Sequence, residues 1–295
     1  MEKMLIIGAN GLLGSKAFEI GSSSYKVYGT YSKNHSRDLT QLDATDKAAV
    51  SKLIGRVKPD LVLDTHALNN LDYCESHRDL AWEINVDGSR NIAQECQAVG
   101  AKYIFISSDY VFDGRKPIYT ENDKPNPLNY YGKTKWATEE VLKVLDIDMI
   151  AIRTSAIYGA VSSTGKQSFV QWLIESLGKG SRVDIISDMF NSPTLNSDIV
   201  YAALRLYGSD SNGIFHVVGG DNISKYEFAM HISEEFDLDS SLINPVKMSQ
   251  LYKDSIRPKK INLSTVKLKK LTGQVPVGVN EGLRLLHHDI DARKV

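Results

Sequence analysis

The sequence predicts an α/β fold: a doubly wound parallel sheet with a smaller C-terminal α/β lobe. Short apolar segments alternate with longer amphipathic segments over roughly the first half of the chain, as in parallel sheets covered by helices on both faces. A glycine-rich turn separates the first two of these segments. Past residue 160 the alternation becomes less regular, as expected for a smaller lobe at the edge of a sheet. The main sheet is therefore expected to be of the Rossmann type.

The composition is that of an ordinary globular protein. The 295 residues are 42 % hydrophobic and 24 % charged, and the net charge of −1 favours neither a nucleic-acid nor a membrane partner. Cys74 and Cys96 suit neither a disulfide framework nor a metal site, and fit a reducing cytoplasm. No apolar run approaches the roughly 18 residues that span a bilayer. Because the first strand starts within a few residues of Met1, we expect no signal peptide.

The first strand, expected at Lys3–Ile7, runs directly into the sequence GANGLLGS, and an amphipathic segment to about Ile20 follows. A strand, a glycine turn and a helix form the context of a dinucleotide-binding turn, in which phosphates lie at the helix N-terminus. A glycine turn without a ligand is the alternative. The expected cofactor contacts in this turn are Gly8, Asn10, Gly11, Leu12, Leu13 and Gly14.

The second strand, expected at Lys26–Tyr31, ends without an acidic residue. An NAD-specific site usually has a carboxylate here to hold the ribose 2′-hydroxyl. Ser32 and Lys33 follow instead and could receive a 2′-phosphate, so the sequence favours NADP(H). A polar loop with a solvated lysine is the alternative.

The remaining strands of the first half are expected to end at the same edge of the sheet. They lie at 61–64, 103–107 and 148–153, and the intervening helices at 47–56, 79–99 and 131–145. Asp46 is expected to cap the first of these helices, and Asp43 could face the adenine. Ligands bind at the carboxyl ends of parallel strands. The residues expected at these ends include Gly8, Ser32, Ala67 and Ser108.

Three residues are the candidates for catalysis: Ser108, Tyr131 and Lys135. Tyr131 and Lys135 are four residues apart, on one face of a helix that Asn129 could open. A nearby lysine cation would lower the pKa of a tyrosine from its usual value of about 10, so that the phenol could exchange a proton with a substrate oxygen. Ser108 could bind the same oxygen. An isolated Tyr-x-x-x-Lys is more often an exposed helix face, but the convergence of strand ends favours the catalytic interpretation.

We expect a Rossmann domain at 1–160 and a substrate-binding lobe at 161–295, with a soft boundary and interleaved parts. Elements of the second part are expected at 168–177, 183–186, 198–207, 214–218, 224–236 and 280–288. Arg257 and Lys259 could meet a diphosphate, although a solvated basic loop is an equal alternative. No histidine or carboxylate cluster has convincing ligand spacing, so no metal is expected, and His287 and His288 are expected on a helix face.

Five motifs resemble the extended short-chain dehydrogenase/reductases, and within them the dTDP-4-dehydrorhamnose reductase branch: GANGLLGS, SSDYVFDG, YYGKTK, IRTSAIYG and FNSPT. The resemblance extends over nearly the whole chain. It implies that NADPH binds to the Rossmann domain and a nucleotide-diphospho-sugar to the second lobe. Residues that match the family's catalytic triad are Ser108, Tyr131 and Lys135; Asp43 and Ala44 match its adenine contacts; and Asn69, Leu71, Asp109 and Ala156 match its sugar pocket.

The chain departs from this family at two places. The loop after the third strand usually reads NAAA, whereas Asp64 and His66 stand here; we interpret both as substitutions beside the cofactor rather than as a catalytic pair. In the reductases position 156 is often tryptophan, whose ring would pack on the sugar, and Ala156 lacks a side chain that could make this contact. The catalytic residues are therefore better supported than the identity of the sugar.

A second resemblance keeps a binding role open. ISSDYVFDG is similar to the corresponding segment of the regulatory β subunit of methionine adenosyltransferase, which implies an NADP-binding partner of another enzyme. In the sugar 4,6-dehydratases the family pattern places a glutamate after this aspartate, whereas Tyr110 follows Asp109 here, so a dehydratase is disfavoured. An epimerase is disfavoured because no acidic residue ends the second strand. The leading hypothesis is an NADPH-dependent 4-keto reductase of a nucleotide-linked 6-deoxy sugar. Reduction or epimerisation of another nucleotide sugar stays open as an alternative. The chain could also form a homodimer or bind a partner enzyme.

Overall fold

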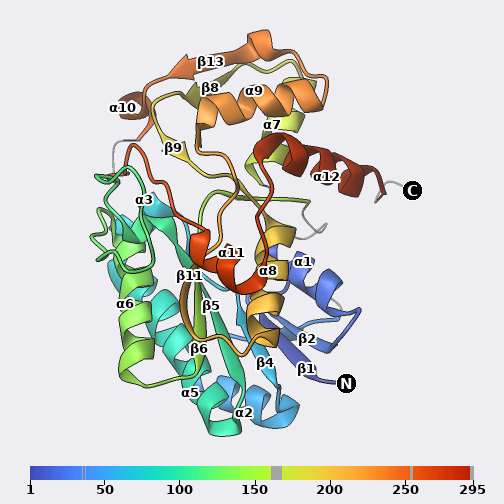
Figure 1. Ribbon diagram of the computed structural model, residues 1–295, viewed down its shortest axis with the longest axis vertical. Coiled ribbons are helices and arrows are strands. Elements are labelled where there is room, and N and C mark those ends of the chain that lie inside the picture. Colours follow the sequence, from blue (N-terminus) through green and yellow to red (C-terminus); the bar gives the residue numbers. More distant parts are fainter. Residues whose placement is uncertain (35, 37, 161–167, 253–254, 293–295) are drawn as a thin grey trace.

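The computed structural model describes residues 1–34, 36, 38–160, 168–252 and 255–292. Figure 1 shows a large body built on one sheet, with a smaller lobe at one end of it. Helices cover both faces of the sheet, as the alternation of apolar and amphipathic segments predicts. The predicted α/β fold class is therefore confirmed.

The central sheet has seven strands in the order β11-β6-β5-β4-β1-β2-β3, and all neighbours are parallel. Its strands are β1 (Lys3–Ile7), β2 (Lys26–Tyr31), β3 (Thr40–Gln41), β4 (Leu61–Asp64), β5 (Lys102–Ser108), β6 (Met149–Thr154) and β11 (Gly213–His216). Because β1 pairs with both β2 and β4, the strand order reverses beside β1. The carboxyl ends of β1 and β4 thus form the crevice at which such sheets bind ligands.

Alternate residues of each central strand bury opposite faces of the sheet. Ile104 and Ile106 of β5 pack in the cluster that contains α1 (Leu12–Gly21) and α8 (Asn196–Gly208). Tyr103 and Phe105 pack in the opposite cluster, with α2 (Lys47–Val57), α5 (Ser89–Val99) and α6 (Tyr130–Val144). This two-sided burial explains why the strands read as apolar runs rather than as alternating ones.

The helix predicted at 79–99 is one continuous helical segment with a local change of geometry. It consists of α4 (Arg78–Trp82), a π-helical turn at Glu83–Gly88 and α5. The short helix α3 (Leu71–Ser76) precedes it. A π turn widens the helix and leaves carbonyl groups that other residues can bind, and such turns often lie at functional sites.

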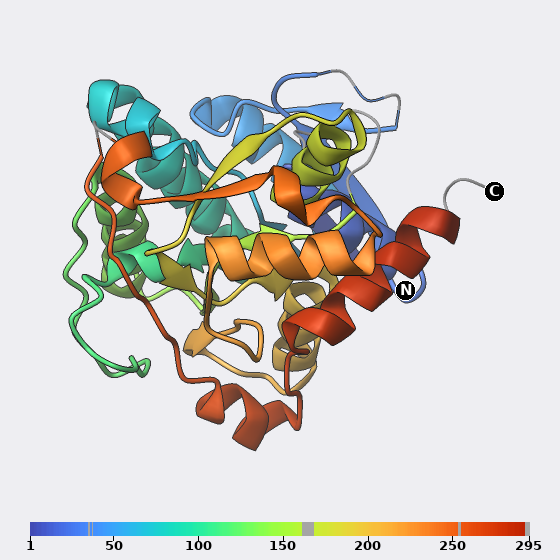
Figure 2. The ribbon, with the colours of Figure 1, turned by 90° about the horizontal axis from the view of Figure 1, so that it is seen from above.

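The smaller lobe has its own hydrophobic core. It contains β7 (Ile157–Tyr158), α7 (Phe169–Gly178), β8 (Val183–Ile186), β9 (Phe190–Asn191), β10 (Thr194–Leu195), β12 (Ile223–Ser224), α9 (Lys225–Glu235), β13 (Ile243–Val246), α10 (Met248–Leu251) and α12 (Val279–Ala292). Figures 1 and 2 show α9 and α12 side by side. In contrast, α8, β11 and α11 (Val266–Thr272) pack in the body of the central sheet, so the chain returns to that body after residue 160.

Within the part of the chain that the structure describes, no helix is long and apolar enough to cross a membrane. The same residues contain no group of three or more histidine, cysteine or carboxylate side chains that could hold a metal ion.

Candidate active site

The glycine turn closes tightly between β1 and α1. A Cβ atom at position 14 would lie only 2.2 Å from the carbonyl oxygen of Gly8, so this approach requires glycine. The N–H of Gly8 donates to the hydroxyl oxygen of Thr30 on β2 at 3.1 Å. The N-cap of α1, Gly11, supplies no side-chain hydrogen bond to the first turn of the helix. The turn therefore has the close backbone approach and the uncapped helix N-terminus that a dinucleotide phosphate requires.

The loop after β2 is fixed against this turn by Asn10. Its side-chain amide donates to the carbonyl oxygens of Lys33 and Asn34, at 3.0 and 3.3 Å. Ser32 and Lys33 are exposed, and their proposed contact with a 2′-phosphate stays a prediction. Residues 35 and 37 of this loop lie outside the described residues.

The residues predicted to face the adenine lie in the next turn of the chain. Asp43 is exposed, and its carboxylate accepts hydrogen bonds from the N–H and hydroxyl of Thr45 at 3.0 and 2.8 Å. Ala44 is buried, and its carbonyl oxygen accepts from Asn91 at 3.1 Å. The predicted N-cap Asp46 is confirmed, because its side chain accepts from the N–H of Ala49.

Tight packing at the start of α6 brings Tyr131 to the end of β5. The predicted N-cap Asn129 is confirmed, since its side chain accepts from the N–H of Gly132 at 2.8 Å. A Cβ atom at Gly132 would lie 2.2 Å from the carbonyl oxygen of Tyr110, so the helix meets the 3₁₀ turn after β5 directly. As a result Tyr131 lies next to Ser108, whose hydroxyl acts on the pKa of the phenol.

Lys135 completes the trio from the next turn of α6. Its Nζ atom donates to the carbonyl oxygen of Ile106 at 2.9 Å and lies 6.0 Å from the centre of the Tyr131 ring. Burial lowers the pKa of Lys135 to about 8, while the carboxylates of Asp64 and Glu139 act in the opposite direction. The three predicted residues are thus close together, although their catalytic roles stay a prediction.

The expected effect of Lys135 on Tyr131 is wrong for this structure. The pKa of Tyr131 is raised, first because neighbouring residues shield the half-buried phenol from water and second because the carboxylate of Asp109 is near; the hydroxyl of Ser108 opposes both effects. The sequence shows the lysine four residues away but not the burial of the phenol, which dominates. Tyr131 is therefore a neutral phenol at neutral pH, which suits a proton donor.

Asp109 is a buried carboxyl group between two hydroxyl groups. It accepts hydrogen bonds from Ser108 at 3.2 Å and from Ser155 at 2.6 Å. Burial raises the pKa of Asp109 to about 6, and these two hydrogen bonds act against the rise.

Ser155 precedes Ala156, which is exposed and has a positive φ of 39°. A non-glycine residue in this region of φ is uncommon and is found preferentially at functional sites.

Arg257 does not lie free in the structure. Its guanidinium pairs with Asp72 of α3 at 2.9 Å, donates to Ser255 at 3.2 Å, and stacks 3.2 Å from the ring centre of Tyr252. Asn129 donates to the carbonyl oxygen of the neighbouring residue 256 at 3.2 Å. The segment that carries Arg257 is therefore attached to α3 and to the start of α6. The other predicted sugar contacts on this side, Asn69 and Leu71, lie just before and at the start of α3.

Asn85 was not predicted as a site residue, although it organises the loop after β4. Its fully buried side chain accepts from the N–H of Leu68 at 2.8 Å, and donates to the carbonyl oxygen of Leu68 at 3.1 Å and to Thr134 at 3.0 Å. It thereby joins the π turn, the loop containing Ala67, and α6. An asparagine between two apolar residues, Ile84 and Val86, was the available signal in the sequence.

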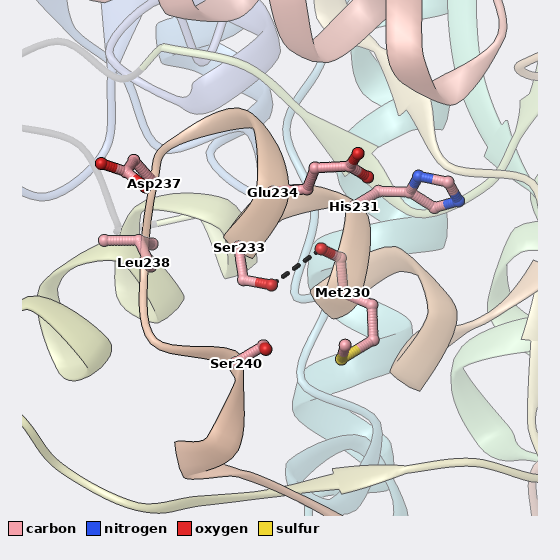
Figure 3. A pocket seen from close by; sticks show the side chains of 7 residues that line it. All are labelled: Met230, His231, Ser233, Glu234, Asp237, Leu238 and Ser240. Carbon is pink, nitrogen blue, oxygen red and sulfur yellow. Dashed lines mark hydrogen bonds between the residues drawn. The ribbon is translucent and has the colours of Figure 1, made fainter.

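The pocket in Figure 3 is separate from this site. It lies on the smaller lobe, between α9 and the segment that follows it, and the predicted site residues do not line it. The side chains that line it are Met230, His231, Ser233, Glu234, Asp237, Leu238 and Ser240.

Three comparisons place the chain among known proteins. It is 34 % identical over 294 residues to methionine adenosyltransferase 2 subunit beta of Rattus norvegicus, which covers 95 % of this chain and 87 % of that protein. It is 33 % identical over 246 residues to the spore coat polysaccharide biosynthesis protein SpsK of Bacillus subtilis, with 83 % of each chain covered. Among solved structures, it is similar to the dTDP-4-dehydrorhamnose reductase of Bacillus anthracis in complex with NADP, with a TM-score of 0.89, 30 % identity, and coverage of 98 % of this chain and 99 % of that chain.

These findings confirm both resemblances that the motifs indicate, to the reductases and to the methionine adenosyltransferase subunit. The family model described as the RmlD substrate binding domain matches residues 1–291, and the chain therefore belongs to that family.

Proposed function

We propose that this protein is an NADPH-dependent reductase of the 4-keto group of a nucleotide-diphospho-6-deoxy sugar, of the dTDP-4-dehydrorhamnose class. The observation that carries the proposal is the position of Tyr131 at the start of α6, next to Ser108 at the carboxyl end of β5 and one helical turn before the buried Lys135. The likeness to a solved dTDP-4-dehydrorhamnose reductase, together with the 33 % identity to a polysaccharide biosynthesis protein, supports this reaction class.

The residues of the crevice fit a dinucleotide. A side chain at position 14 would fill the turn, and Gly11 leaves the first N–H groups of α1 without a side-chain cap. The similar Bacillus anthracis structure contains NADP. The residues that would hold NADP(H) are Gly8, Asn10, Gly11, Leu12, Leu13, Gly14, Ser32, Lys33, Asp43, Ala44, Ala67, Tyr131 and Lys135. When bound, NADPH supplies the hydride for the sugar C4.

The protein's own part in the reaction is to hold and deliver a proton. Tyr131 keeps its proton at neutral pH and gives it to the oxygen that develops negative charge at C4. Ser108 donates a hydrogen bond to the same oxygen, for which its hydroxyl turns away from Asp109. Lys135, whose Nζ atom donates to the carbonyl oxygen of Ile106, would bind the nicotinamide ribose. Asn69, Leu71, Asp109, Ala156 and Arg257 contact the sugar diphosphate.

A second candidate function is a non-catalytic NADP-binding subunit of another enzyme. The observation that favours it is the 34 % identity to methionine adenosyltransferase 2 subunit beta over 95 % of the chain. This candidate requires the same cofactor crevice but no turnover of a sugar.

Oxidation of NADPH with dTDP-4-keto-6-deoxy-glucose, measured with and without a 3,5-epimerase, separates these candidates. Turnover that requires the epimerase supports reduction of dTDP-4-dehydrorhamnose, and turnover without it supports a different 6-deoxyhexose product. Tight NADPH binding without turnover in either reaction would contradict the proposed reaction and favour another nucleotide sugar or the regulatory role. A pull-down for a partner enzyme then distinguishes those two outcomes.

A further inference from the structure

A buried carboxylate ends the strand β4, beside the crevice. Asp64 is 1 % exposed, and each of its two oxygens has two hydrogen-bonding partners. One oxygen binds the Nδ1 atom of His66 and accepts from the backbone N–H of the same residue at 3.2 Å. The other accepts from the hydroxyl groups of Tyr103, at 2.5 Å, and Ser89, at 3.2 Å. So many donors around one carboxylate hold it in its ionised form.

The second ring nitrogen of His66 also faces an oxygen. Its Nε2 atom lies 3.0 Å from the carbonyl oxygen of Ile84, in the π turn between α4 and α5. A carbonyl oxygen and an ionised carboxylate can only accept, so both nitrogens must donate, and this arrangement requires an imidazolium. Burial lowers the pKa of His66, but the attraction of Asp64 and the hydrogen bonds to Asp64 and Ile84 outweigh it, so the pKa is raised above its usual value.

The imidazolium lies where three parts of the predicted cofactor crevice meet. A Cβ atom at Gly8 would be 3.4 Å from the backbone nitrogen of His66, which places the residue against the glycine turn. A Cβ atom at Gly88 would be 3.0 Å from the Nε2 atom of His66 and 3.2 Å from the side chain of Ala44. His66 also precedes Ala67, another predicted cofactor contact. The His66 ring therefore joins the end of β4 to the π turn, next to these three predicted cofactor contacts.

We propose that protonated His66 is a positioning residue, which clamps the loop after β4 to the π turn and so couples NADP(H) affinity to its own proton. This inference rests on the proposed binding of NADP(H) in the crevice. The ionisable groups that act on the Asp64–His66 pair from neighbouring elements are Lys135 of α6, Tyr103 of β5 and Cys96 of α5. Of these, Lys135 disfavours the imidazolium and Asp64 holds it in place.

The sign of the pH effect follows from the raised pKa. The clamp is complete when the imidazole is protonated, and it is lost as the pH rises through the pKa of His66 in the folded protein. NADPH should therefore bind with constant affinity on the acidic side of that pKa and more weakly on its alkaline side. A coupling between two sites of this kind usually changes affinity by about fivefold or more.

Fluorescence titrations of NADPH binding across this pH range test the proposal. The His66→Gln variant keeps an amide that can donate to Ile84 but cannot titrate, so its alkaline weakening should be smaller than that of the wild type and should keep only the part that comes from Lys135, whose pKa is about 8. His288→Gln, at an exposed histidine of α12, is the matched control and should keep the wild-type profile. An alkaline weakening of the same size in His66→Gln and in the wild type would overturn the proposal.

A second measurement uses the free protein and needs neither cofactor nor substrate. With ¹⁵N-labelled histidine, NMR should show one imidazole that keeps both nitrogens protonated at pH values above the usual histidine pKa, and this signal should be missing in His66→Gln. A neutral tautomer for His66 already at the usual histidine pKa, about 6.5, would overturn the clamp. Absence of NADPH binding at every pH would contradict the proposed function and the coupling together, whereas binding with an unchanged pH profile in His66→Gln would contradict the coupling alone.

Discussion

Arg153 of β6 and Glu139 of α6 form a bidentate ion pair that is closed off from solvent. The Nε and Nη2 atoms of Arg153 donate to the two carboxylate oxygens at 2.9 and 2.6 Å, and the side chains are 1 % and 0 % exposed. Ser107 donates to the same carboxylate at 2.6 Å. Glu139 also follows Lys135 by one helical turn and raises its pKa against the larger effect of burial. Glu139, fixed in place by Arg153, therefore supplies a negative charge near the candidate catalytic lysine.

Removal of one partner of this pair should be costly. We expect Glu139→Gln to lower the free energy of unfolding by about 3–5 kcal/mol, because Arg153 keeps a buried charge without a counter-ion. Urea unfolding measures the change, and the neighbouring exposed residue provides the control, since Glu140→Gln should cost less than about 0.5 kcal/mol. If the single variant does not fold, the double variant Glu139→Met/Arg153→Met should recover much of the lost stability, because it removes both charges. Equal stability of Glu139→Gln and Glu140→Gln would contradict the prediction.

Tyr131→Phe should abolish most of the reductase activity and change NADPH affinity far less, because it removes only one of the proposed cofactor contacts. Loss of a positioned proton donor typically costs about 10²–10⁴-fold in rate. Steady-state NADPH oxidation gives the rate, and a fluorescence titration gives the NADPH affinity. Tyr130→Phe is the matched control on the same helix turn, and it should keep the wild-type rate. Full activity in Tyr131→Phe would contradict the proposal that the phenol donates a proton to the substrate.

The buried Asp109 should make stability depend on pH in a defined window. Its pKa in the folded protein, about 6, lies above the usual 3.8, so folding favours the protonated carboxyl group. Relative to Asp109→Asn, the wild type should be most stable below pH 3.8 and should lose about 3 kcal/mol as the pH rises through about 6. Urea unfolding of both proteins across this window measures the difference. An Asp210→Asn control, at an exposed site, should follow the wild type. A difference between wild type and Asp109→Asn that does not change with pH would show that the buried carboxyl group does not titrate as described.

The parts of the site that sequence predicts are those in which local chemistry decides the structure. GANGLLGS requires a close turn whatever surrounds it, and Asn129 caps a helix through a neighbour three residues away. The Asp64–His66 and Glu139–Arg153 pairs follow a different rule, because their partners and their burial depend on the packing of separate elements. The same reason explains why the direction of the pKa shift of Tyr131 was predicted wrongly. The two-residue strands of the smaller lobe are too short for a hydrophobic period to reveal them.

Arg257 should be the residue that recognises the diphosphate of the substrate, in competition with Asp72. The guanidinium is paired with Asp72 at 2.9 Å, and a diphosphate offers it stronger, bidentate hydrogen bonds. Arg257→Met should weaken the binding of dTDP by about 10- to 100-fold, the value of charge-assisted hydrogen bonds, and leave NADPH affinity unchanged. Asp72→Asn should tighten dTDP binding because it removes the competing carboxylate. Isothermal titration calorimetry measures the affinity of both variants for dTDP and the affinity of Arg257→Met for NADPH.

Lys259→Met is the control for this prediction, because Lys259 is exposed on the same basic segment. If the segment acts only through its general charge, Lys259→Met and Arg257→Met should weaken dTDP binding equally. If Arg257 only attaches its segment to α3, then Asp72→Asn should weaken dTDP binding as Arg257→Met does, since both variants break the same ion pair. Opposite effects of these two substitutions are therefore the result that separates recognition of the diphosphate from a purely structural contact.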